Sequence, residues 1–184
     1  MPKLNVDLRG LVHLGNLSRG YFVATIINNA IPFLLLPVLT RYLSTSEYGN
    51  IALFQFFLSL SNALTGASVQ TVITKYFFNS KKEYIAEIIG NSIYLTAALS
   101  MILTAVILLF YPVLKPILEL PLLWLIVIPP TSFAFTVFSM GLTVMRNQKK
   151  VLFFGVGQIG NTLLNLSFSL IFIVILMWNW QGRA

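Results

Sequence analysis

Long apolar runs alternate with short charged segments along this chain of 184 residues. A transmembrane helix needs about 20 apolar residues, because the hydrocarbon core of a bilayer is about 30 Å thick and a helix rises about 1.5 Å per residue. Five runs without Asp, Glu, Lys or Arg are long enough to span it: 20–40, 48–74, 88–114, 120–145 and 151–182.

The pattern therefore predicts an all-α fold, a polytopic transmembrane helix bundle with five spans. Helices are favoured because backbone groups in lipid must be hydrogen-bonded within their own segment. Short segments of alternating polarity, which are typical of a transmembrane barrel, are not found. After a tail at 1–17, the bundle is expected over 18–184, with helices at about 18–43, 46–78, 84–113, 118–146 and 151–180.

Composition supports this interpretation and excludes several kinds of site. Hydrophobic residues make up 57% of the chain and charged residues only 9%, whereas soluble domains average about 25% charged residues. There is no cysteine, and His13 is the single histidine, so neither a disulfide nor a Cys/His metal site is expected. No cofactor is expected either. The net charge of +7 is ascribed to topology and anionic lipid headgroups rather than to a nucleic-acid partner.

Basic residues concentrate in the tail and in the connections 75–87 and 146–150. In a five-span topology these three regions share one side of the membrane. The opposite side holds Arg41, Lys115 and Arg183. Since Lys and Arg are enriched in cytoplasmic loops, the sequence predicts a cytoplasmic N-terminus and an external C-terminus.

Polar residues recur at helical spacing inside the spans. The fourth span carries Ser132, Thr136, Ser139 and Thr143, and either Arg146 or Asn147 continues this face. Small polar residues commonly serve close helix packing in membranes. The side-chain amides of Asn and Gln are harder to explain, because burying an amide without a hydrogen-bond partner costs roughly 2–7 kcal/mol. Packing and a hydrated cavity both remain open for the amide-bearing residues Asn28, Asn29, Asn62, Gln70, Gln158, Asn161 and Asn165.

Prolines within two spans predict broken helices. Pro32 and Pro37 lie in the first span, and Pro129 and Pro130 lie in the fourth. Each proline removes a backbone donor and kinks the helix axis. Such breaks are common in transporters that move between states, although a static kink that improves packing would have the same sequence signature.

Two short motifs lead to different interpretations. Ser44 and Glu47 form an S-x-x-E capping box, which predicts that a second helix begins directly after the first. The sequence GVGQIG at 155–160 matches G-x-G-x-x-G but lies in an uncharged helix with no acidic residue after it. We interpret it as close helix contact rather than a dinucleotide site. No Ser/His/Asp set or intramembrane carboxylate pair supports catalysis, so the protein is not expected to be an enzyme.

Four segments of the chain carry a resemblance to a known family: NNAIPFLLLPVLTRYLSTSEYG at 28–49, VITKYFFNSKKE at 72–83, LTVMRNQKKVLFF at 142–154 and MWNWQGRA at 177–184. They resemble bacterial polysaccharide and O-antigen flippases of the multidrug/oligosaccharidyl-lipid/polysaccharide (MOP) exporter superfamily. The first segment resembles the family's first helix and hairpin. The resemblance implies an N-terminal lobe that lacks its sixth helix, with the C-terminal lobe absent.

The resemblance also implies a function. A lipid-linked oligosaccharide, a polyprenyl-diphosphate sugar, would be flipped to the outer leaflet of the bacterial inner membrane by alternating access, for surface polysaccharide biosynthesis. Its partners would be polysaccharide assembly proteins, the missing lobe, and a proton or sodium ion to which transport is coupled. Alternatives are a drug or cation exporter of the same superfamily and a non-transporting scaffold of a polysaccharide assembly complex. The expected substrate-binding residues are Arg146, Arg41, Lys75, Asn28, Asn29, Gln55, Asn62, Gln70, Gln158 and Asn165.

Overall fold

The computed structural model describes residues 43–66, 68–118 and 120–172, together with isolated helical positions between 22 and 41. The all-α prediction is confirmed over this part of the chain. Its helices are α2 (Thr45–Gly66), α3 (Val69–Phe77), α4 (Lys82–Leu118), α5 (Leu122–Asn147) and α6 (Val151–Leu170).

The expected number of five membrane spans is not confirmed over the described residues. Three described segments are long and apolar enough to cross a bilayer: Lys82–Val113, Leu122–Asn147 and Val151–Leu170. Helices α2 and α3 add a fourth if they form one bent span. Most of the predicted first helix at 18–43, the tail at 1–17 and residues 173–184 lie outside the described residues, so a five-span count is not established.

The helix predicted over 46–78 is divided in two. Helix α2 ends at Gly66, α3 begins at Val69, and their axes differ by 41°. Glycine has low helix propensity, and here it also permits close approach of a neighbouring helix. The bend allows both helices to follow the surface of α5, which α2 and α3 each contact.

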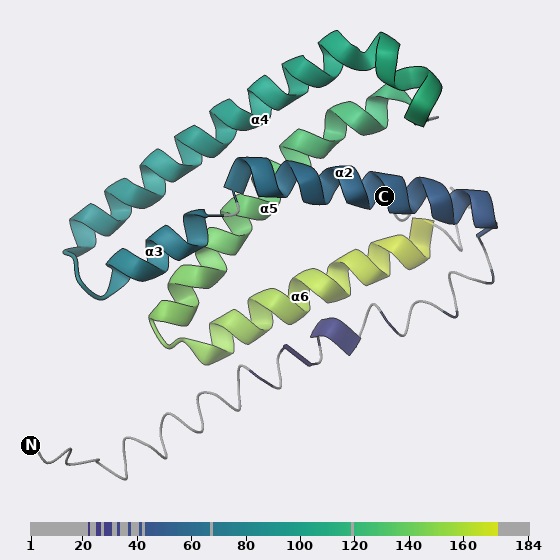
Figure 1. Ribbon diagram of the computed structural model, residues 1–184. Coiled ribbons are helices and arrows are strands. Elements are labelled where there is room, and N and C mark those ends of the chain that lie inside the picture. Colours follow the sequence, from purple (N-terminus) through teal and green to yellow (C-terminus); the bar gives the residue numbers. More distant parts are fainter. Residues whose placement is uncertain are drawn as a thin grey trace, which may run out of the picture.

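Helix α5 lies at the centre of the described bundle and contacts α2, α3, α4 and α6 (Figure 1). Pro129 and Pro130 lie inside it, as the sequence predicts. Because proline has no amide hydrogen, the carbonyls of Leu125 and Ile126 lose their usual helical donors. The expected breaks at Pro32 and Pro37 cannot be placed in the same way, since Pro32 lies outside the described residues and Pro37 is one isolated helical position.

The interior of the bundle contains small polar side chains as well as apolar ones. Ser61, Thr65, Thr96, Ser132 and Thr136 are all buried. Large apolar residues point outward instead: Leu109, Leu152 and Val156 are among many that are exposed. Small residues inside and large apolar residues outside are typical of helix packing in lipid.

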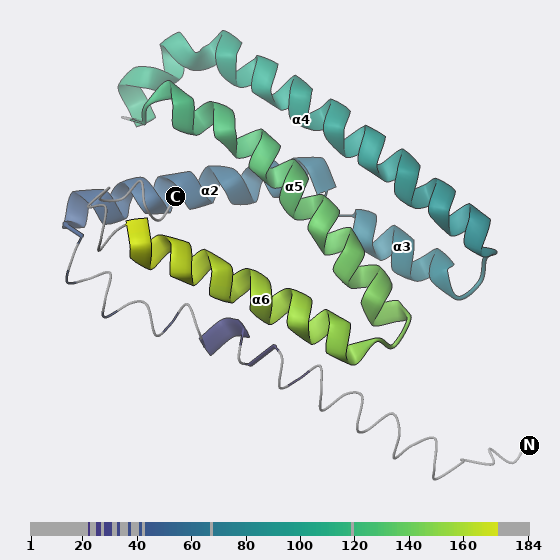
Figure 2. The ribbon, with the colours of Figure 1, turned by 180° about the vertical axis from the view of Figure 1, so that it is seen from behind.

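Basic residues gather at one end of the described bundle. The α3–α4 and α5–α6 turns lie at the same end in both views (Figure 1, Figure 2). The basic residues in or next to these turns are Lys75, Lys81, Lys82, Arg146, Lys149 and Lys150. At the opposite end, Leu43 and Ile51 at the start of α2 pack with Leu166 and Leu170 of α6.

The α5–α6 turn is short because its backbone amides cap the C-terminus of α5. Lys149 has a φ of 59° and donates its amide hydrogen to the carbonyl of Arg146, at 3.0 Å. The Lys150 amide donates to the carbonyl of Met145, also at 3.0 Å. This pair of bonds is a Schellman motif. Lysine therefore occupies the left-handed position where glycine is usually found.

The predicted capping box before α2 is confirmed. The Ser44 amide and hydroxyl both donate to Glu47 Oε2 at 2.7 Å. The return bond, from the Glu47 amide to Ser44 Oγ, is longer, at 3.4 Å. Ser44 is thus the N-cap residue, and the carboxylate of Glu47 also lies at the positive end of the helix dipole.

We expect Ser44→Ala to lower the free energy of unfolding by about 1 kcal/mol, the usual cost of losing an N-cap side chain. Thermal unfolding of the detergent-solubilised chain, followed by circular dichroism, measures the change. Ser46→Ala is the matched control, because Ser46 is exposed in the same turn and is not part of the capping box. Equal stability of the two variants would contradict the prediction.

Candidate functional site

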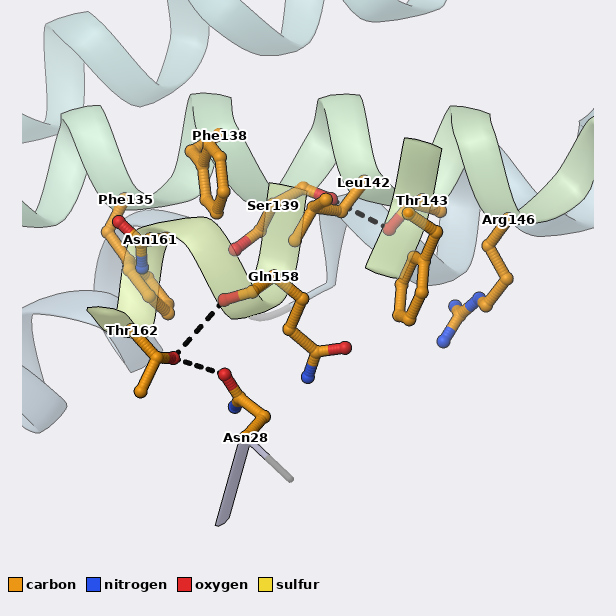
Figure 3. A pocket seen from close by; sticks show the side chains of 11 residues that line it. Asn28, Phe135, Phe138, Ser139, Leu142, Thr143, Arg146, Gln158, Asn161 and Thr162 are labelled. Carbon is orange, nitrogen blue, oxygen red and sulfur yellow. Dashed lines mark hydrogen bonds between the residues drawn. The ribbon is translucent and has the colours of Figure 1, made fainter. Parts of the chain in front are cut away.

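A polar cavity of about 270 Å³ lies between α5 and α6. Side chains of α5 form one wall of the cavity, and side chains of α6 form the facing wall (Figure 3). Position 28 of the chain closes a third side. The lining residues are Asn28, Phe135, Phe138, Ser139, Leu142, Thr143, Arg146, Phe154, Gln158, Asn161 and Thr162.

A hydrogen-bonded contact joins α6 to position 28. The Thr162 hydroxyl donates to Asn28 Oδ1 and lies 3.2 Å from the carbonyl oxygen of Gln158 (Figure 3). Asn28 and Thr162 are both half-buried. The contact holds one amide of the predicted first helix against the cavity.

Gln158 brings an unsatisfied acceptor to the cavity. Its Oε1 is buried and accepts no hydrogen bond from the described residues. Leaving such a group unpaired costs about 1–3 kcal/mol. A hydroxyl group or a water molecule in the cavity would remove that cost.

Arg146 is the cation of the cavity. It lies in the last turn of α5, is exposed, and extends to the same side of the cavity as Gln158 in Figure 3. The sequence left open whether Arg146 or Asn147 continues the polar face of this helix. The structure separates them: Asn147 is buried, and its Nδ2 lies 3.5 Å from Thr74 Oγ1 of α3.

The glycine motif at 155–160 lies inside α6, and the element before it is the helix α5. A Cβ atom added at Gly157 would lie 3.0 Å from Leu142 Cδ2 of α5. The interpretation as close helix contact is therefore supported, and the strand that a dinucleotide site requires is replaced by a helix.

The structure brings three of the ten expected binding residues to the cavity: Asn28, Arg146 and Gln158. Gln70 is half-buried on α3, and Lys75 is exposed, with its Nζ 5.5 Å from the centre of the Tyr76 ring. Four more of the expected binding residues are exposed: Asn29, Arg41, Gln55 and Asn165. Roles in binding for these residues stay predictions.

Asn62 takes part in a helix–helix contact. The Ser132 hydroxyl of α5 donates to Asn62 Oδ1 at 2.7 Å. The Thr65 hydroxyl lies 2.9 Å from Ser132 Oγ and 2.9 Å from the carbonyl of Ser61. Thr65 and Ser132 are buried. For this amide the packing interpretation accounts for the contacts that the structure shows.

Several lining residues were absent from the expected binding set. From the sequence, Asn161 is one of the amides that are costly to bury, and Ser139 and Thr143 belong to a polar stripe, but none of the three is an expected binding residue. The aromatic residues Phe135 and Phe138 stand three positions apart on α5. That spacing beside the polar stripe was the available signal, because ligand pockets commonly combine aromatic walls with a few polar groups.

The fold and the cavity together define a class: a helical membrane protein with a polar, cationic cavity between its helices. The sequence model of the polysaccharide biosynthesis protein family matches residues 19–181. The chain therefore belongs to this family, whose members are typically transporters rather than enzymes.

One curated relative is protein 1 of the Lsg locus of Haemophilus influenzae. It is 36% identical over 58 residues, which are 32% of this chain and 14% of the relative. The chain thus matches only a small part of that protein's length. No solved structure gives a significant match.

Proposed function

We propose that the chain forms part of a flippase that moves a lipid-linked oligosaccharide from the cytoplasmic to the outer leaflet of a bacterial inner membrane. The observation that carries the proposal is the α5–α6 cavity, whose lining includes Arg146, Gln158 and Asn161. An arginine suits the diphosphate of such a lipid, since charge-assisted hydrogen bonds to phosphate are strong. Amides suit sugar hydroxyls, which both donate and accept.

The charge of the cavity favours an anionic cargo over a cationic drug. Its lining, over the residues that the structure describes, holds Arg146 and no carboxylate. Among the described acids, Glu47, Glu83 and Glu87 all lie in the first or second turn of a helix. An exporter of cations would be expected to place an acid at its binding site, because an interior carboxylate offsets the desolvation of a cation. A carboxylate for proton or sodium coupling is expected elsewhere in the transporter.

The size of the cavity limits what it binds by itself. Its volume of about 270 Å³ is slightly below the range of about 300–1,000 Å³ that is usual for small-molecule sites. An oligosaccharide does not fit, whereas a diphosphate or one sugar ring does. We therefore propose that the cavity is one wall of a larger passage, and that the lipid tail stays in the bilayer.

We assign the end with the α3–α4 and α5–α6 turns to the cytoplasm, because basic residues gather there and Lys and Arg favour cytoplasmic loops. Arg146 then lies near the cytoplasmic mouth of the cavity. That is where a diphosphate headgroup made in the cytoplasm would first be bound.

Arg146→Ala in the chromosomal gene is expected to reduce surface polysaccharide about tenfold or more, since one hydrogen bond to a charged group contributes about 1.5–3 kcal/mol. The lipid-linked precursor should accumulate inside the cell. Quantitative labelling of surface polysaccharide and mass spectrometry of extracted lipids measure the two effects.

Lys81→Ala is the matched control, because Lys81 is an exposed cation at the same end of the bundle and does not line the cavity. Immunoblotting must show equal amounts of both variants in the membrane. Normal export with Arg146→Ala would reject the site. Loss of polysaccharide without precursor accumulation would favour a scaffold of an assembly complex.

A further inference from the structure

A second hollow surface lies where α4 begins and α5 ends. Two adjoining cavities, of about 760 Å³ and 420 Å³, share the lining residues Ile89, Val144, Gln148 and Lys150. Because they share these residues, the two form one groove, which we call the α4–α5 groove. It extends from the basic end of the bundle toward Val137 in the middle of α5.

The groove is separate from the polar cavity. The α5 residues that line the cavity include 135, 138, 139, 142 and 146, whereas the groove is lined by 137, 140, 141 and 144 of α5 and by 148 directly after it. The second set is the first shifted by about two positions. Since successive helical residues turn by about 100°, the two sets lie about 200° apart, on opposite faces of α5.

The polarity of the groove changes along its length. At the basic end it is lined by Ser80, Lys82, Gln148 and Lys150. Further along, the walls are apolar, with Ile93, Val137 and Met140. Lys82 is the first residue of α4 and Lys150 directly precedes α6. Each ammonium group therefore adds to the positive end of a helix dipole instead of offsetting it.

We propose that the α4–α5 groove binds one anionic glycerophospholipid, with its phosphate between Lys82 and Lys150 and an acyl chain along the apolar walls. Basic pockets between transmembrane helices commonly bind anionic lipid headgroups. The acyl chain gains little from the groove, because it leaves an equally apolar bilayer. The selectivity must therefore come from the two lysines, while the groove fixes where the lipid lies.

Gly141 offers a way to block the groove without disturbing the fold. It lines the apolar part, and a Cβ atom added there meets nothing within 4 Å. Gly141→Leu should therefore fill the space that the acyl chain would occupy. It leaves both lysines in place, and leucine also favours the helix more than glycine does.

Native mass spectrometry of the full chain in a non-ionic detergent tests the proposal. Dioleoyl phosphatidylglycerol and dioleoyl phosphatidylcholine are titrated separately. Each lysine near an anionic headgroup is expected to contribute about a fivefold preference, and the pair on the order of 30-fold. The variant K82Q/K150Q should reduce the preference to about threefold or less, and Gly141→Leu should weaken binding of both lipids.

The control variant K81Q/K149Q removes the same charge from neighbouring lysines, which do not line the groove. It should keep the preference. An equal loss in both double variants would show a general charge effect and overturn the proposal, as would an absence of preference in the unmodified chain. Full competition by soluble glycerol phosphate, or unchanged binding in Gly141→Leu, would exclude a role for the apolar walls. None of these results depends on Arg146 or on transport.

Discussion

Replacing Gly66 by alanine is expected to destabilise the bundle by about 1–3 kcal/mol, the usual cost of overfilling a packed contact. A Cβ atom at Gly66 would lie 2.4 Å from Thr136 Cγ2 and 2.6 Å from Thr136 Oγ1. Thr136 is buried in α5 and β-branched, so its side chain has little freedom to move. The substitution must push α2 away from α5.

Gly90→Ala is the matched control, because Gly90 lies inside α4 and a Cβ atom there meets nothing within 4 Å. Alanine is better than glycine in a helix by about 0.8–1 kcal/mol, so this variant is expected to gain stability. Unfolding in mixed micelles of increasing dodecyl sulfate content, followed by circular dichroism, measures both changes. Similar shifts for the two variants would show that Gly66 is not a close contact.

Ser132→Ala is expected to lower the free energy of unfolding by about 1–1.7 kcal/mol. The substitution removes the donor that reaches Asn62 Oδ1 and the group beside the Thr65 hydroxyl. Both partners would remain between α2 and α5 without this bond. Single hydrogen bonds between membrane helices average about 0.6 kcal/mol and reach about 1.7. Ser132 joins two groups and is fully buried, so we expect the upper part of that range.

Thr131→Ala serves as the control for this prediction. The Thr131 hydroxyl donates only to the carbonyl of Val127, within its own helix, and the residue is exposed. Its loss should change stability by less than about 0.5 kcal/mol. The same dodecyl sulfate titration applies. If Ser132→Ala were as stable as Thr131→Ala, the α2–α5 hydrogen bonds would not contribute to stability.

The sequence predicted those features that depend on neighbouring residues alone. Uncharged runs located the described helices because an apolar segment in lipid has few alternatives to a helix. The spacing of Ser44 and Glu47 predicted a capping box, since both groups belong to one turn. The polar stripe of α5 predicted buried positions such as Ser132 and Thr136, because helical periodicity defines a face.

The sequence could not distinguish polar groups that pack from polar groups that line a cavity. Asn62 and Gln158 are both amides within predicted spans, yet one accepts a bond from Ser132 and the other presents an oxygen without a partner among the described residues. The difference depends on which helix lies opposite, and that is a tertiary property. The division between α2 and α3 was missed for the same reason, because close contact with Thr136 determines where Gly66 is needed.

The hydrogen bonds between α2 and α5 also have a consequence for biogenesis. Ser132 follows Thr65 by 67 positions and Asn62 by 70. At a synthesis rate of about 5–20 residues per second, the ribosome needs on the order of ten seconds to make the partner. During that interval α2 must leave the translocon with Asn62 Oδ1 lacking its Ser132 donor, or wait beside it. An insertase or a neighbouring helix that shields α2 until α5 arrives would therefore control how much of the protein assembles correctly.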